Sequence, residues 1–236
     1  MKNRIWELDA FRGICLIGMV IVHFVYDLTE LYGILSWNPP EGFVFVQQWG
    51  GVLFLLLSGI CVTLGSRSVR RGLIVFASGM IVSAVTYGMY HFGFTGKSIL
   101  IYFGVLHCLG VCMLLWVCFK KLPVWALATF GAGFTALGFY FRTLTVENPW
   151  LFPLGLTTSK FASSDYFPLL PYLGFFLLGA VLGRTLYGKK QTLLPKVNPQ
   201  NLILRFLQWC GRQSLLIYLL HQPILAGICT LITLFK

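Results

Sequence analysis

Most of the N-terminal stretch of residues 7–27, ELDAFRGICLIGMVIVHFVYD, is apolar enough for a bilayer, yet it contains Arg12, His23 and Asp27. An α-helix turns about 100° per residue, so Arg12 and His23 differ by only about 20° around its axis. Asp27 follows His23 by four residues and lies within side-chain reach of it. Ionisable groups cost roughly 2.5–3.5 kcal/mol each in a membrane helix and usually face a cavity or the bundle interior. A proton path through a transporter would explain the aligned histidine and aspartate, and this alternative stays open.

The N-terminal end of this polar stripe also has a structural interpretation. Asp9 lies three residues before Arg12 and can pair with it. Both residues could be interfacial anchors, and Asp27 could lie among the headgroups at the other end. His23 lies well inside the apolar stretch, so it is the hardest of the four to explain by anchoring alone.

Two further histidines lie deep in apolar stretches. His107 stands in YFGVLHCLG, and His221 stands in SLLIYLLHQPIL, where Gln222 and Pro223 follow it. Proline breaks backbone hydrogen bonding and loosens a helix. The three intramembrane histidines have no short ligand spacing and no companion carboxylate cluster, so no metal site is predicted. Hydrogen bonds between helices would explain His107 and His221 equally well.

The elements that must position these residues are membrane helices. The chain has 236 residues, of which 57% are hydrophobic and 11% charged, whereas a soluble domain carries roughly a quarter charged residues. The sequence predicts an all-α, polytopic transmembrane helix bundle of about seven spans, forming a single domain over residues 1–236. The expected spans are 9–28, 44–65, 72–91, 99–119, 123–141, 166–186 and 213–235.

The net charge of +11 follows this topology. With a cytoplasmic N-terminus and an outer C-terminus, fourteen basic residues fall on the cytoplasmic side and four on the other, as the positive-inside rule requires. We therefore expect no nucleic-acid partner. No cleavable signal pattern is expected either, because the first apolar segment is long, carries polar residues and has no small-residue cleavage site after it.

Two of the connections between the expected spans are long. Residues 142–165 form a Ser/Thr-rich outer loop, a candidate lid. Residues 187–212 end in NLILRFLQWCGRQ, where Leu202, Phe206 and Trp209 recur at helical spacing, which predicts a short amphipathic helix along the inner interface. The seven cysteines include no CxxC pair and are expected to be packing residues rather than disulfides.

Five motifs in order resemble a known group of membrane enzymes. LDAFRGICLIGMVIVHF and GGVLFLLLSGI resemble the first two spans of the transmembrane acyltransferases. FGVLHCLGV, YFPLLPYLGFFLLGAVLGR and GRQSLLIYLLHQPIL resemble more particularly the heparan-α-glucosaminide N-acetyltransferase catalytic-domain family and its bacterial relatives. The resemblance covers essentially the whole chain.

This resemblance implies a multi-pass enzyme of the cell membrane, in a bacterium the cytoplasmic membrane. Cytosolic acetyl-CoA, or a related acyl-CoA, would be the co-substrate, and a saccharide or envelope component the acceptor on the outer side. His23 would act as general base or acyl-accepting nucleophile, with Asp27 orienting its ring. The residues implied to bind acyl-CoA, with the basic ones holding its phosphates, are Arg12, Asp9, Arg67, Arg70, Arg71, Lys120 and Lys121. Those implied to line the channel are Ser58, His107, His221 and Gln222.

One departure places the catalytic prediction on His23. The lysosomal member of that family has a histidine shortly before a Trp-Asn pair, whereas here LYGILS precedes Trp37 and Asn38. This departure leaves an amino-sugar acceptor in question. The sequence does not determine the acceptor, the acyl chain, the presence of an acyl-enzyme or the oligomeric state, for which a homo-oligomer stays open. The alternatives are a small-solute or proton-coupled transporter using His23 and Asp27, and a non-enzymatic scaffold, which would have no need of the aligned stripe.

Overall fold

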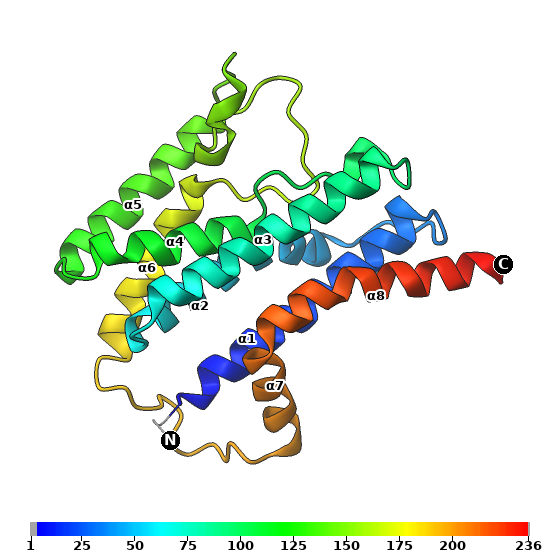
Figure 1. Cartoon of the computed structure of the whole chain (residues 1–236). Coiled ribbons are helices and arrows are strands. Elements are labelled where there is room, and N and C mark those ends of the chain that lie inside the picture. Colours follow the sequence, from blue (N-terminus) through cyan, green and yellow to red (C-terminus); the bar gives the residue numbers. More distant parts are fainter. Residues whose placement is uncertain (1–3, 236) are drawn as a thin grey trace. The chain divides into compact units, whose positions relative to one another are not determined.

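A computed structural model describes residues 4–235, so Lys2 and Lys236, which entered the charge count, lie outside the described residues. The fold is helical over 72% of the chain, without a strand in the described part. The helices are α1 (Trp6–Tyr26), α2 (Glu41–Leu64), α3 (Ser68–His91), α4 (Val105–Phe119), α5 (Val124–Phe141), α6 (Leu169–Leu186), α7 (Leu202–Arg212) and α8 (Ser214–Leu234). Figure 1 shows their order along the chain.

The predicted all-helical polytopic fold is confirmed. Six helices of the described chain, all except α4 and α7, are long and apolar enough to cross a membrane. The fourth predicted span, 99–119, is instead a shorter apolar helix of 15 residues, because Lys97–Ile99 forms a separate 3-10 turn and α4 begins only at Val105. The sidedness of the two chain ends stays a prediction.

The described chain packs as two compact units. One contains residues 4–54 and 190–235, and the other contains residues 55–189, so α2 contributes to both. The prediction of one functional domain is not tested by this division.

In the first unit, α1 packs against α7 and α8. Figure 1 shows α7 beside the N-terminal half of α1. Two glycines make the contact with α7 close: a Cβ on Gly13 would collide with the carbonyl of Leu207, and one on Gly211 with the carbonyl of Asp9. The predicted amphipathic helix is present as α7, whose Leu202, Ile203, Phe206 and Trp209 side chains are exposed.

In the second unit, α3 packs on α4 and α5 packs on α6, both pairs antiparallel. Gly72 faces Gly110 in the first pair, and Gly131 faces Gly174 in the second. The C-terminal half of α2 packs on α6, where a Cβ on Gly179 would meet the carbonyl of Leu56. Small residues at such positions let membrane helices approach closely.

Candidate active site

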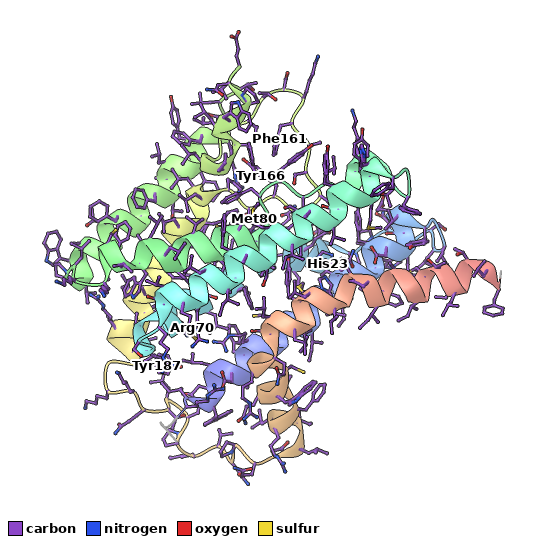
Figure 2. The ribbon with its side chains drawn as sticks, in the orientation of Figure 1. His23, Arg70, Met80, Phe161, Tyr166 and Tyr187 are labelled. Carbon is purple, nitrogen blue, oxygen red and sulfur yellow. The ribbon has the colours of Figure 1, made fainter. Side chains whose placement is uncertain are left out.

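The first unit contains a group of four polar residues that meet in two pairs across the first span and α8, His23 with His221 and Asp27 with Gln222. We call it the histidine cluster, and Figure 2 marks His23 on α1. The α-helix of α1 gives way at Asp27 to a single π-helical turn, Asp27–Leu31. Such turns are frequent at functional sites. This wider turn begins at Asp27, which supplies the carboxylate of the cluster and is 0% exposed.

The structure pairs His23 with His221. The two ring centroids are 4.9 Å apart and the ring planes are inclined by 72°, an edge-to-face arrangement. His23 is half-buried and His221 is 8% exposed. The sequence placed both residues in a channel, but it gave no sign that they would be neighbours.

One hydrogen bond fixes the form of the His221 ring. Its Nδ1 lies 2.5 Å from the carbonyl oxygen of Tyr218. A carbonyl oxygen can only accept, so Nδ1 carries the proton, and in the neutral ring Nε2 must carry the lone pair. That Nε2 atom is buried and has no hydrogen-bond partner among the described residues. His221 therefore presents a hydrogen-bond acceptor to its surroundings.

The carboxylate of Asp27 is held by Gln222 rather than by His23. Gln222 Nε2 donates to Asp27 Oδ1 over 3.4 Å. This differs from the expectation that Asp27 orients the His23 ring: the ring of His23 meets His221, and the hydrogen bond of Asp27 crosses to α8. The other oxygens of the pair, Asp27 Oδ2 and Gln222 Oε1, have no partner within the described chain.

Three unpaired acceptors thus lie in one cluster. Four buried side-chain polar atoms lack a partner in the described residues, and three of them are Asp27 Oδ2, His221 Nε2 and Gln222 Oε1, the fourth being Thr95 Oγ1. Buried polar groups are nearly always hydrogen-bonded, and each exception costs about 1–3 kcal/mol. Three exceptions in the same place indicate a site that receives hydrogen-bond donors.

Neighbouring contacts hold the cluster in shape. Tyr32 directly follows the π-helical turn, and its hydroxyl donates to the carbonyl of Ala226 over 3.2 Å and lies 3.3 Å from Thr230 Oγ1. Leu225 and Cys229 are buried on α8 beyond the cluster. Sequence reasoning missed Tyr32, since nothing local distinguishes it from an interfacial tyrosine.

The predicted CoA ligands Arg12 and Asp9 form a network at the N-terminal end of α1. Arg12 Nη1 lies 3.0 Å from Asp9 Oδ1 and also donates to the carbonyl of Gly211 over 3.3 Å. Arg4 approaches the same carboxylate at 3.7 Å. Beside them on α7, burial raises the pKa of the Cys210 thiol, which keeps it neutral. The structure gives Arg12 a role in joining α1 to α7, and its role toward CoA stays a prediction.

A second acidic residue holds the connection that leads to α7. The carboxylate of Glu7 accepts hydrogen bonds from Thr192 Oγ1 and from the backbone N–H of Leu193, each over 2.8 Å. Glu7 lies in the first turn of α1, where a negative charge is favourable.

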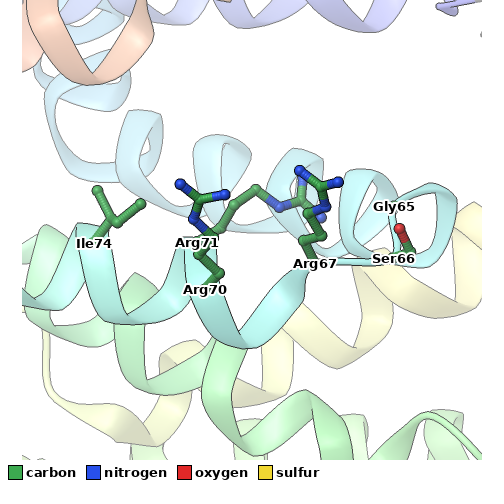
Figure 3. Close-up of a pocket in the computed structure, with 6 residues that line it drawn as sticks. All are labelled: Gly65, Ser66, Arg67, Arg70, Arg71 and Ile74. Atoms are coloured by element: carbon green, nitrogen blue, oxygen red, sulfur yellow. The ribbon is translucent and has the colours of Figure 1, made fainter.

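The other predicted CoA ligands belong to the second unit. Arg67, Arg70 and Arg71 line an open pocket of about 390 Å³ at the start of α3, with Gly65, Ser66 and Ile74. Figure 3 shows the three guanidinium groups extending to the same side of the helix start. Guanidinium groups at the positive end of a helix suit a phosphate. We call this the arginine pocket.

Lys120 and Lys121 follow the C-terminus of α4, at the same end of the α3–α4 pair as the arginine pocket, and both are exposed. A residue that sequence reasoning missed organises this turn: Arg184 donates to the carbonyls of Lys120 and Leu122 and stacks over Trp116, 5.4 Å from the ring centroid. A cation at a helix C-terminus is favourable. Arg12 and Asp9 belong to the other unit, so a single site for all seven predicted ligands stays a prediction.

His107 has a structural explanation. Its Nδ1 accepts the backbone N–H of Gly104 over 3.2 Å and so caps α4, and Ser83 Oγ lies 3.5 Å from Nε2. Phe76 and Phe103 enclose the ring, and Gly79 leaves room for it. Ser58 is buried in the same unit. That these two residues line one channel with the histidine cluster stays a prediction.

Comparison with known proteins gives one match. The family model described as "Heparan-alpha-glucosaminide N-acetyltransferase, catalytic" matches residues 4–223. A search of the curated proteins found no match, and a search of the solved structures found none either. The family match ends at Pro223 and therefore takes in all four residues of the histidine cluster.

Proposed function

The chain belongs to the heparan-alpha-glucosaminide N-acetyltransferase catalytic-domain family, and we propose that it transfers an acetyl group from cytosolic acetyl-CoA across the membrane. The family match confirms the resemblance read from the motifs and implies a membrane acetyltransferase. The acceptor is a saccharide or another envelope component on the outer side, and the membrane is the bacterial cytoplasmic membrane. The observation that carries this proposal is the histidine cluster: a membrane-embedded imidazole, His23, beside buried acceptors that have no protein partner in the described chain.

The chemistry starts from the neutral imidazole of His23. Placed against the thioester, this ring is a base toward the acceptor's amine or hydroxyl, or the nucleophile that takes the acetyl group. His221 adjoins it, and Gln222, the next residue on α8, holds Asp27 by a hydrogen bond. Asp27 then stabilises positive charge that develops on the two rings at a distance rather than by direct contact with His23.

The phosphates of the donor call for cationic residues at the cytoplasmic face. The arginine pocket, with Lys120 and Lys121 at the same end of α3 and α4, supplies five of them. Arginine binds phosphate through a planar fork of donors, and lysine adds point charge. After transfer of the acetyl group, CoA would remain on the cytoplasmic side, in the compartment that makes it.

The test uses the purified protein in nanodiscs, wild type beside His23→Ala. Acetyl-CoA binding is measured by calorimetry, and the release of free CoA is measured chromatographically. We expect saturable binding in both proteins and CoA release that is lost in the variant. If acetyl-CoA and longer acyl-CoA molecules all fail to bind the wild type, the acyltransferase proposal is wrong.

The three unpaired acceptors also suit a proton relay, so a proton-coupled transporter is the second candidate. The two functions differ in their need for an acyl donor. Flux of a solute or of protons through liposomes that contain the protein but no acyl-CoA would favour the transporter. The transporter would be excluded if these liposomes show no flux and acetyl transfer occurs only when acetyl-CoA is added.

A further inference from the structure

The pairing of His23 with His221 points to two different catalytic roles for the two rings. We infer that His221 is a second catalytic residue, the base that takes the proton from the acceptor while His23 carries the acetyl group. The inference rests on the proposed function and goes beyond it, since that function requires only one histidine.

The need for a second base follows from the chemistry of His23. Once a ring nitrogen of His23 has formed a bond to the acetyl carbon, that nitrogen can no longer take a proton. The other ring nitrogen keeps a lone pair, but acylation makes it a much weaker base and it lies on the far side of the ring from the acetyl carbon. An attacking amine or hydroxyl must nevertheless lose one proton as its new bond to carbon forms. Another lone pair must therefore lie beside the acetylated ring.

His221 Nε2 meets this need in three respects. Its ring lies edge to face with His23 at 4.9 Å between centroids, which places it beside the acetyl group. Its Nδ1–H bond to the Tyr218 carbonyl leaves the lone pair on Nε2. No donor in the described chain occupies that lone pair, although the atom is buried. Of the other two unpaired acceptors, Gln222 Oε1 is an amide oxygen and a very weak base, and the ring that meets His23 is that of His221, whereas Asp27 pairs with Gln222.

Each step conserves atoms and electrons. A His23 nitrogen attacks the thioester carbon, the carbon–sulfur bond breaks, and the departing CoA thiolate receives the proton that the His23 ring loses. The acceptor then attacks the acetyl carbon and its proton passes to His221 Nε2. The carbon–nitrogen bond to His23 breaks, the electron pair returns to His23, and the proton on His221 passes to it. Both rings are neutral again, and the products are free CoA and the acetylated acceptor.

The test separates the two half-reactions in the full-length protein in nanodiscs. His221→Asn is the main variant, because the asparagine amide can still donate to the Tyr218 carbonyl while the Nε2 lone pair is removed. His221→Gln is a second variant, and His91→Asn is the matched control, since His91 is exposed at the end of α3 in the other unit. Acetyl-CoA is mixed with protein and free CoA is measured over time, first alone and then with glucosamine or hydroxylamine as the acceptor probe.

We expect wild type, His91→Asn and both His221 variants to release about one equivalent of CoA per protein in a rapid first phase. Later turnover with water or glucosamine should fall about 100-fold or more in the His221 variants, the usual contribution of a general base. Added imidazole should restore part of it. Turnover with hydroxylamine should fall less than turnover with glucosamine, because the amine of hydroxylamine is largely unprotonated at neutral pH.

Three results would overturn the inference while leaving the proposed function standing. The first is later turnover in the His221 variants within threefold of wild type. The second is loss of the first phase in His221→Asn while the protein still binds acetyl-CoA. The third is a wild type that releases CoA only when an acceptor is present, because no acetylated His23 would then form. Absence of CoA release from the wild type under every condition would instead overturn the proposed function itself.

Discussion

The imidazole rings of His23 and His221 meet edge to face, 4.9 Å apart between centroids and inclined by 72°. The contact joins α1 and α8, which pack against each other in one compact unit. Around it, three buried polar atoms of His221, Asp27 and Gln222 have no partner in the described residues. A contact that served packing alone would not leave these acceptors unsatisfied, and this observation supports the proposed active site.

The first prediction concerns His23. His23→Ala should abolish acetyl transfer and leave the Kd for acetyl-CoA within about threefold of wild type, because the phosphates are expected to bind elsewhere. His91→Ala removes an exposed imidazole and serves as control. Calorimetry gives the Kd, and CoA release gives the rate. Unchanged turnover in His23→Ala would remove this residue from the mechanism.

The second prediction concerns the bond between Gln222 and Asp27. Gln222→Leu should lower the free energy of unfolding by about 1–3 kcal/mol, because it leaves a buried carboxylate without its donor. The double variant Asp27→Leu with Gln222→Leu should recover much of that loss, since replacing both partners by apolar groups can be nearly neutral. Denaturant unfolding of all four proteins in the cycle measures the coupling. Simple additivity would mean that the two side chains do not interact.

The third prediction concerns the close approach of α1 and α7. Gly211→Ala should destabilise the protein by about 1–3 kcal/mol, because the added methyl group would collide with the Asp9 carbonyl. Gly18→Ala on α1 is the matched control: a Cβ there has nothing within 4 Å, and alanine is the better helix former by about 1 kcal/mol. The two variants should therefore shift the unfolding midpoint in opposite directions. A Gly211→Ala protein as stable as wild type would show that the two helices do not pack so closely.

The fourth prediction concerns the arginine pocket. Replacing Arg67, Arg70 and Arg71 together by alanine should raise the Kd for acetyl-CoA at least tenfold, since a hydrogen bond to a charged group contributes about 1.5–3 kcal/mol. The three side chains are exposed, so the unfolding midpoint should stay close to that of wild type. Lys160→Ala, in the connection between α5 and α6, is a control for loss of positive charge. An unchanged Kd in the triple variant would place the phosphates elsewhere.

The fifth prediction distinguishes the two roles open to Arg12. Arg12→Ala should raise the KM for acetyl-CoA, and it should also lower stability, because Asp9 and the Gly211 carbonyl lose their shared partner. The KM is measured at a temperature well below the unfolding midpoint of the variant, so that the two effects separate. A loss of stability with an unchanged KM would make Arg12 solely an anchor between α1 and α7.

The sequence by itself determined those properties that depend on local composition and on the period of a helix. Runs of apolar residues gave the membrane class and the all-helical fold, and the five motifs gave the family. The turn of about 100° per residue is enough to place His23 and Asp27 on one face of the first span. The same rules located α7, because Leu202, Phe206 and Trp209 recur at helical spacing.

Only the tertiary structure decided which faces meet. Asp27 and Gln222 are 195 residues apart, and Arg12 and Gly211 are 199 apart. The free energy that brings such pairs together comes from packing and backbone close approach along whole helices, as at Gly13 and Gly211, and no residue pattern within one helix records its partner. The sequence could therefore place His23, Asp27 and His221 inside the membrane, but only the fold made His221 the neighbour of His23 and Gln222 the partner of Asp27.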